Sequence, residues 1–189
     1  MNKKRCIPEK SLILIDDSNL YYGCKKYDWE IDYQKFYDWL HYTFNIYEIY
    51  FFGGIITQKA YLDSHPNKEF SDFVNEQDKR KNFFKKLKKI GYKVKSKPVV
   101  SLYDSTKGDY KRKCNFDVEI TINAIDNLNS YKELILCSGD GDFIKLLKYL
   151  KGKYKKTTII SHKDRTNREL LKTANRCIYL EGIKTKIEK

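Results

Sequence analysis

The chain has 189 residues, enough for one domain with a sizeable buried core, and its hydrophobic content of 41% and aromatic content of 15% exclude an intrinsically disordered protein. It carries 38 Lys and Arg against 25 Asp and Glu, a formal net charge of +13, which indicates a polyanionic partner such as RNA, DNA or an anionic membrane. No run of about 18 apolar residues is present, so we expect no membrane-spanning helix, and the start of the chain does not read as a signal peptide.

Apolar runs and helical spacing predict alternating strands and helices along the first part of the chain. Residues 11–15 are Ser-Leu-Ile-Leu-Ile and predict a buried strand. Asp32 is a candidate N-cap for a helix over 32–44, in which apolar and aromatic residues recur at helical spacing. A second strand over 47–56 ends near two glycines, and the mixed polar segment 57–76 predicts a loop or a short helix.

The middle of the chain is rich in lysine. Residues 77–90 predict an amphipathic helix with a basic outer face, which Gly91 ends. Residues 92–100 alternate loosely and predict a third strand. The segment 101–113 contains Gly108 and four basic residues, and we expect an exposed loop there.

The last part of the chain repeats the alternation of helices and strands. Helices are expected over 116–128, 142–150 and 167–174, and strands over 134–137, 157–160 and 177–180. Strands and helices at this spacing indicate an α/β sandwich with a mainly parallel sheet. We expect a basic N-terminal tail over 1–10, one domain over 11–181 and a short C-terminal tail over 182–189.

Short acidic segments stand where predicted strands end. Asp16 and Asp17 follow the first strand, Asp140 and Asp142 follow the fourth, and the carboxyl ends of parallel strands meet at one edge of a sheet. Crowded carboxylates are costly unless a cation neutralises them, and ligand sets made of oxygen favour Mg²⁺ or Mn²⁺ over Zn²⁺. Alternatively, these aspartates form turns and cap helices. Two such segments at equivalent strand ends favour the metal site.

Three segments together resemble the motif series of NYN domains, which belong to the PIN-like nuclease superfamily. They are Ile-Asp-Asp-Ser-Asn (15–19), Asn-Phe-Asp-Val-Glu-Ile-Thr-Ile-Asn-Ala (115–124) and Ser-Gly-Asp-Gly-Asp-Phe (138–143), and the likeness extends over residues 11–181. The resemblance implies a three-layer α/β sandwich with a mainly parallel sheet of five to six strands. It also implies a metal-dependent endoribonuclease that uses Mg²⁺ or Mn²⁺ and leaves a 5′-phosphate.

The same resemblance implies a set of site residues. Those that match the family's motifs are Asp16, Asn19, Asp117, Asn123, Asp140 and Asp142. The four aspartates among them correspond to metal ligands, and Asn19 corresponds to a polar residue that shapes the site.

Two positions depart from the family's pattern. Asp17 stands where the family often has glycine, and it is either an additional acid or a turn residue. Asn123 stands where the family usually has a further aspartate, and a neutral amide is a weaker ligand for a hard cation. Three explanations of Asn123 stay open: a natural one-metal variant, a non-catalytic RNA-binding protein, or an engineered substitution.

An aspartyl phosphatase or phosphotransferase is a third class of function, because such enzymes also use an aspartate at the end of the first strand. It is disfavoured because Ser18 stands where its second aspartate would be.

Basic and aromatic residues flank the acidic motifs. Lys and Arg side chains can bind phosphates, and exposed tyrosines can stack on unpaired bases. The candidates are Lys107, Lys111, Arg112, Lys113, Lys163, Arg165, Arg168, Tyr21, Tyr22 and Tyr110. We therefore expect RNA as the partner and no membrane, and a homodimer stays possible. A composition typical of AT-rich genomes could account for part of the positive charge.

The five cysteines are dispersed and contain no Cys-x-x-Cys pair, so we expect neither a zinc ribbon nor a disulfide framework. Reduced thiols favour a cytoplasmic location.

Overall fold

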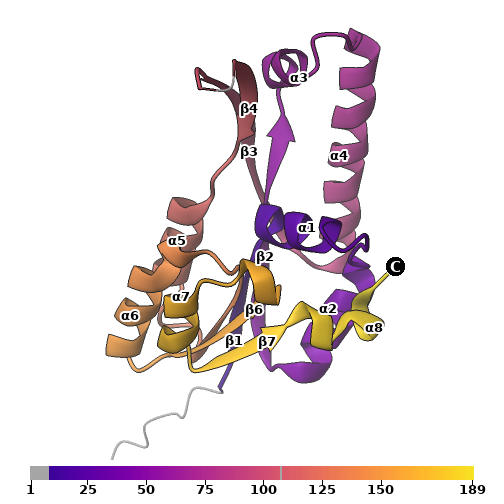
Figure 1. Ribbon diagram of the computed structural model, residues 1–189. Coiled ribbons are helices and arrows are strands. Elements are labelled where there is room, and N and C mark those ends of the chain that lie inside the picture. The colour runs from indigo at the N-terminus through magenta and orange to yellow at the C-terminus, as the bar shows by residue number, and fades with distance from the viewer. Residues whose placement is uncertain (1–8, 107) are drawn as a thin grey trace, which may run out of the picture.

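The computed structural model describes residues 9–106 and 108–189. A seven-stranded sheet runs through its centre in the order β4–β3–β2–β1–β5–β6–β7 (Figure 1). The strands are β1 (Ser11–Asp16), β2 (Ile46–Ile56), β3 (Lys93–Asp104), β4 (Asp109–Lys113), β5 (Glu133–Cys137), β6 (Lys156–Ser161) and β7 (Arg176–Tyr179). All pairings between neighbouring strands are parallel except that of β4 with β3. The predicted α/β class with a mainly parallel sheet is confirmed.

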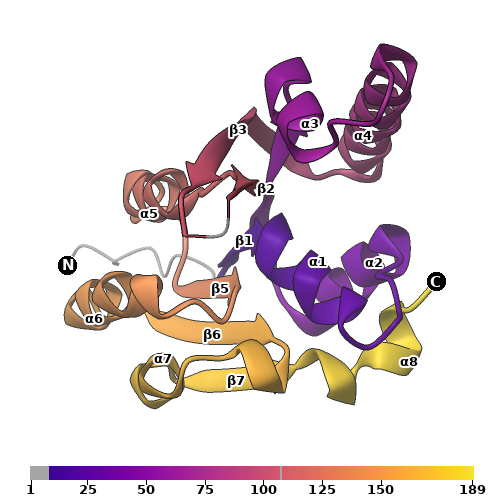
Figure 2. The same ribbon diagram turned by 45° about the horizontal axis from the view of Figure 1, so that its top comes forward.

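Helices cover the sheet on both faces, which gives the three layers seen in Figure 2. One face is covered by α1 (Asp17–Lys25), α2 (Tyr33–Thr43), α4 (Phe70–Ile90) and α8 (Lys184–Ile187), and the other by α5 (Asp117–Asp126), α6 (Ile144–Gly152) and α7 (Arg168–Thr173). The connections also contain α3 (Gln58–Ser64) and the 3₁₀ helices η1 (Gly141–Phe143), η2 (Lys163–Arg165) and η3 (Leu180–Gly182).

The central strand β1 shows why its sequence is an unbroken apolar run. Ile13 and Ile15 pack into the core on the side of α1 and α2, whereas Leu12 and Leu14 pack on the side of α5 and α6. Side chains of a strand alternate between its faces, and a parallel strand covered by helices on both sides needs apolar residues at every position. At the end of the chain, Ile187 of α8 is fully buried in the same core as Ile13.

The segment 101–113 differs from the sequence-based prediction. An exposed loop was expected there, and this prediction was wrong, because the end of β3 and the whole of β4 form an antiparallel hairpin. The hairpin adds a seventh strand to the five to six expected. All five residues of β4 are exposed and four of them are charged, so the strand has no alternation of apolar and polar residues.

Three helices also differ from the predictions. The helix α8 lies within residues 182–189, for which only a short C-terminal tail was expected. The helix expected from residue 77 begins at Phe70, so the segment 57–76 contains both α3 and the first turns of α4. The short helix α1 directly follows β1, and the sequence did not predict it. Among the residues that the structure describes, no helix combines the length and apolar character needed to cross a membrane.

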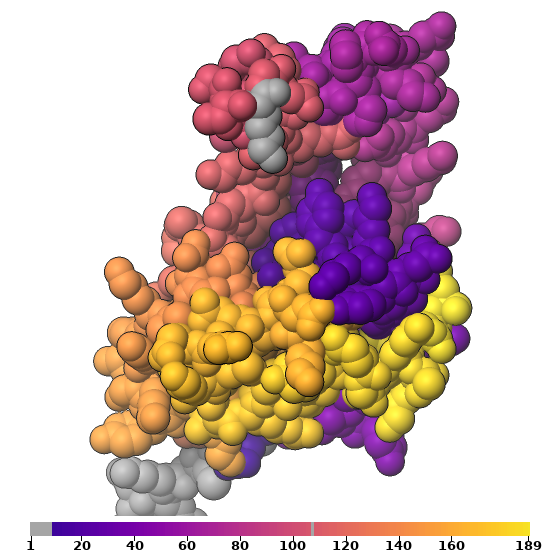
Figure 3. Space-filling view, in the orientation of Figure 1, coloured from indigo at the N-terminus to yellow at the C-terminus, as the bar shows by residue number. Residues whose placement is uncertain are grey.

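The strands β2, β3 and β4 rise beyond the end of β1 and form a projecting arm with α3 and the start of α4. We call residues 54–76, 96–106 and 108–113 the arm. Asp16 pairs with Phe52 and Phe52 pairs with Lys95, so β3 continues from this level to Asp104, roughly 30 Å at the usual rise per residue. In Figure 3 the arm stands above the rest of the molecule, and the surface is hollowed where its base meets α1.

Candidate functional site

The order of the strands places the acidic motifs at one point of the sheet. From β1 the chain moves outward through β2 and β3, and after β4 it returns to the other side of β1 and moves outward through β5, β6 and β7. Such a reversal leaves a crevice outside the carboxyl ends of the two central strands. Asp16 is the last residue of β1, and Ser138 directly follows β5. The topology therefore brings two distant segments of the chain to the same crevice.

Three carboxylates meet in this crevice. Asp117 is the first residue of α5, Asp140 caps η1 and Asp142 lies within η1, and one oxygen of each lies within 4.8 Å of the others. Burial raises the pKa of Asp117, a hydrogen bond from Asn115 opposes this, and the charges of Asp140, Asp16 and Asp142 raise the pKa further. The mutual repulsion and the all-oxygen donor set fit one hard divalent cation. We call Asp117, Asp140 and Asp142 the acidic cluster.

Asp16 lies beside the acidic cluster and is held by three hydrogen bonds. Its Oδ1 accepts from the Ser18 hydroxyl at 2.7 Å and from the Asn19 backbone N–H at 3.3 Å, which caps α1. Its Oδ2 accepts from the Ser138 hydroxyl at 3.1 Å. Asp16 is only 8% exposed. It is not one of the three mutually close carboxylates, but its charge raises the pKa of Asp117.

The loop after β5 is fixed to α1 and to the loop after β6. The side-chain oxygen of Asn19 accepts from the backbone N–H of Gly139 at 3.1 Å, and the carbonyl of Gly139 accepts from the N–H of Asn167 at 2.9 Å. A Cβ at residue 139 would lie 2.2 Å from the backbone oxygen of Arg165, so only glycine fits there. This packing sets the position of Asp140, the next residue.

Asp17 is turned away from the acidic cluster toward α4. It is the first residue of α1 rather than part of a turn, and its carboxylate forms an ion pair with Arg80. Arg80 also donates to the backbone oxygen of Gly54 at 3.0 Å, and its guanidinium lies 4.4 Å from the centre of the Phe84 ring. Burial raises the pKa of Asp17, and the adjacent guanidinium opposes this increase.

Asn123 is not brought to the acidic cluster. It lies six residues after Asp117 in α5, which places it roughly 120° away around the helix axis. There it lines a separate pocket of about 330 Å³ with Glu119 and Lys97, which form an ion pair at 2.5 Å.

The basic residues of the arm differ in whether they form ion pairs. Lys111 forms an ion pair with Asp104 at 2.5 Å, and Arg112 pairs with Glu76 at 3.2 Å. Lys113 is exposed at the base of the arm and has no ion pair with any residue that the structure describes. Lys107 lies outside the described residues.

A second group of basic residues lies on the loop after β6. Lys163 and Arg165 are exposed on η2, and Arg168 is exposed at the start of α7. The backbone oxygen of Arg165 faces Gly139, so this group lies next to the loop that carries Asp140.

The candidate stacking residues lie in two separate pairs. Tyr21 and Tyr22 are both about half exposed on α1, with ring centres 5.2 Å apart. Tyr110 pairs with Tyr103 across the hairpin at 5.1 Å, and the ammonium of Lys59 lies 5.6 Å from the centre of its ring.

Residues that position the acids were missed at the sequence level. Asn115, two residues before Asp117, both donates to its carboxylate and accepts from its backbone N–H at 2.7 Å. Its signal is the Asn-x-Asp spacing typical of a turn before a helix. Asn167 contacts Gly139, and Arg80 contacts Asp17. These residues are distant in the sequence, so no local pattern predicts the contacts.

The doubly wound α/β sheet with carboxylates gathered at its switch point is compatible with the three-layer sandwich of PIN-like domains. The NYN domain model matches residues 10–181, and the chain belongs to this family. It is 31% identical over 183 residues to the Low amplitude and bright protein LabA of Synechococcus elongatus, covering 96% of this chain and 89% of that protein. The crystal structure of a protein of unknown function from Vibrio parahaemolyticus superposes with a TM-score of 0.71 at 25% identity, covering 100% of both chains.

Proposed function

We propose that this protein is an endoribonuclease that depends on Mg²⁺ or Mn²⁺. The observation that carries the proposal is the convergence of Asp117, Asp140 and Asp142 at the switch point of a domain from the PIN-like nuclease superfamily. A bound Mg²⁺ or Mn²⁺ supplies a polarised water and neutralises charge at a scissile phosphate. Negative charge at this crevice, within a protein of net charge +13, favours binding of a cation together with a polyanion.

The chain's own residues have distinct parts in this proposal. The acidic cluster holds the cation, and Asp16 adds negative charge beside it while keeping α1 and the loop after β5 in register. Asn19 fixes the backbone at Gly139, so that Asp140 stays in position. Lys113, Arg165 and Arg168 bind backbone phosphates at the rim, and Tyr22 offers a stacking face for a base, whereas Tyr21 lies on the face of α1 that also carries Asp17.

The substitution Asp140→Asn tests the proposal. We expect Mn²⁺-dependent cleavage of a labelled RNA to fall by at least about 100-fold, a loss of roughly 2.7 kcal/mol of transition-state stabilisation. The far-UV circular dichroism spectrum should not change, and the rise in Tm that Mn²⁺ produces in the native protein should be lost, because a ligand stabilises only the state that binds it.

Asp78→Asn is the matched control, because Asp78 is an exposed acid on α4 outside the crevice. It should leave cleavage and the Mn²⁺-dependent Tm rise unchanged. Full activity of Asp140→Asn, or cleavage that persists in a chelator, would contradict the assignment. RNA binding by the native protein with no cleavage in Mn²⁺ would support a non-catalytic RNA-binding domain instead.

A further inference from the structure

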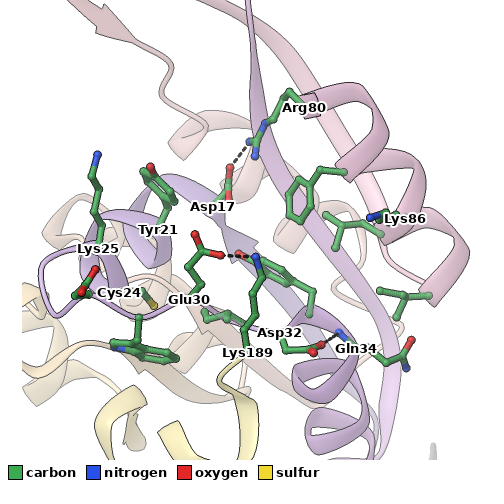
Figure 4. A pocket seen from close by; sticks show the side chains of 17 residues that line it. Asp17, Tyr21, Cys24, Lys25, Glu30, Asp32, Gln34, Arg80, Lys86 and Lys189 are labelled. Atoms are coloured by element: carbon green, nitrogen blue, oxygen red, sulfur yellow. Dashed lines mark hydrogen bonds and ion pairs between the residues drawn. The ribbon is translucent and has the colours of Figure 1, made fainter. Parts of the chain in front are cut away.

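Another cavity lies on the other side of α1 from the acidic cluster. It has a volume of about 1040 Å³ and lies between α1, the turn that leads into α2, the helix α4 and the end of the chain (Figure 4). We call it the α1 pocket. Asp17, Tyr21 and Cys24 line it at the i, i+4, i+7 spacing of one helix face, whereas Asn19 points to the loop that carries Asp140. Two faces of one short helix therefore serve two separate cavities.

The inner walls of the α1 pocket are apolar and largely aromatic. They include Trp29, Tyr33 and Phe83, together with Ile31 and Leu87. Trp29, Ile31 and Leu87 are nearly inaccessible to solvent, which makes them part of a packed wall rather than mobile surface groups. A concave, preformed cavity of this size with aromatic walls suits a planar ring system of a small ligand.

Most of the charged groups at the pocket already have partners. Arg80 pairs with Asp17, Lys189 pairs with Glu30, and Asp32 caps α2 by accepting from two backbone N–H groups. These groups are therefore satisfied without a ligand.

Lys25 and Lys86 are different, because neither forms an ion pair with any residue in the described part of the chain. They lie on α1 and α4, and Figure 4 shows them on opposite sides of the pocket. Lys25 lies over the ring of Tyr21, with its Nζ 5.7 Å from the ring centre. Asp28, also at the rim, carries a carboxylate that can accept hydrogen bonds from an amine. The uncommitted groups are thus two ammonium ions and one carboxylate.

We propose that the α1 pocket is a nucleotide-binding site separate from the acidic cluster. The aromatic walls contact the base, the ammonium group of Lys25 or of Lys86 binds the phosphate, and Asp28 accepts from an exocyclic amine of the base. This combination favours a purine mononucleotide with an amino group, for which adenosine monophosphate is the simplest probe.

Tryptophan fluorescence can report binding directly. The chain has two tryptophans, and Trp39 packs against Phe36 and Phe44 rather than lining the pocket. In the full-length Trp39→Phe variant, Trp29 is the sole indole. We expect adenosine monophosphate, titrated in the presence of a chelator, to change the Trp29 emission in a saturable way. Adenosine and inorganic phosphate should each bind more weakly than the nucleotide.

Two sets of variants locate the site. Lys25→Ala with Lys86→Ala should weaken binding by at least about tenfold, because the double variant removes the charge-assisted contact with the phosphate whichever lysine makes it. Lys85→Ala with Lys88→Ala should have no effect, because these exposed lysines lie on α4 outside the pocket. Asp140→Asn should also leave nucleotide binding unchanged. The nucleotide site would therefore stand even if the nuclease proposal were contradicted.

The same titration contains the outcomes that would overturn the proposal. They are a flat Trp29 signal up to millimolar nucleotide, equal binding of adenosine and the nucleotide, or full binding by the Lys25 and Lys86 double variant. A 5′-phosphorylated hexanucleotide distinguishes the source of the nucleotide. Preference for the hexanucleotide would identify the ligand as the end of an RNA strand, whereas preference for the mononucleotide would identify it as a free nucleotide. Either result supports the site.

Discussion

Two consecutive aspartates have different partners because one ends a strand and the other begins a helix. Asp16 lies in the crevice, where hydroxyl and backbone donors hold both of its oxygens. Asp17 forms an ion pair with Arg80 on the opposite side of α1. If the guanidinium of Arg80 lay in the crevice, it would compete with a metal ion for the acidic cluster. Its contacts with Gly54 and the Phe84 ring keep it out.

The position of Asn123 leads to a prediction that differs from the one based on the family motif. Because Asn123 faces Glu119 and Lys97 rather than the acidic cluster, Asn123→Asp should increase neither the affinity for Mn²⁺ nor the rate of RNA cleavage. Isothermal titration calorimetry with Mn²⁺ measures the first, and a cleavage assay measures the second. Asp142→Asn, which removes one carboxylate of the cluster, is the control and should lower the affinity. Tighter Mn²⁺ binding by Asn123→Asp would show that the side chain reaches the site.

At the scale of elements, the loop between β5 and α6 is built by close backbone packing. Gly139 contacts the backbone at Arg165, and a Cβ at Gly141 would lie 2.7 Å from the side-chain nitrogen of Asn167. The two glycines alternate with Asp140 and Asp142, so the residues that allow close packing and those that carry charge share one short segment. The geometry of the acidic cluster therefore depends on contacts between the loops after β5 and β6.

This packing predicts a marked difference between two glycine substitutions. Gly139→Ala should lower the free energy of unfolding by about 1–3 kcal/mol, because its Cβ would collide with backbone that cannot move freely. Gly152→Ala at the end of α6 should raise it by about 0.5–1 kcal/mol, because there is open space at that site and alanine favours the helix. Urea denaturation measures both changes. Equal effects of the two substitutions would show that the loop after β5 can adapt.

Elements with a strong apolar pattern could be predicted from the sequence, and those without one could not. The run 11–15 indicated β1 because the strand is buried on both faces. Asp16 and Asp140 could then be placed at the same carboxyl edge of a parallel sheet. The hairpin strand β4 was missed because its residues are exposed on both faces. The ion pair of Asp17 with Arg80 joins residues 63 positions apart and requires the packing of α4 against β2. Local patterns contain no information about such contacts.

For the molecule as a whole, the distribution of charge matters more than its total. The net charge is +13, yet the acidic cluster lies at the base of an arm whose exposed lysines differ in their pairing. Lys113 lies at the base of the arm, four residues before Asp117, and has no ion-pair partner in the described chain. Lys111 lies nearer the tip of the hairpin and is neutralised by Asp104. A polyanion that reaches the cluster should therefore gain more from Lys113 than from Lys111.

The salt dependence of RNA binding can test this difference between two lysines of one strand. Each phosphate contact on a single strand contributes a slope of about −0.7 to the dependence of log K on log salt concentration. Under the proposed function, Lys113→Gln should make the slope less steep by about 0.7, and Lys111→Gln should change it little, because Asp104 already neutralises Lys111. Fluorescence anisotropy with a labelled single-stranded RNA over a series of KCl concentrations measures both slopes, in a chelator so that no cleavage intervenes. Equal slopes for the two variants, or an unchanged slope for Lys113→Gln, would show that the RNA does not pass along the base of the arm.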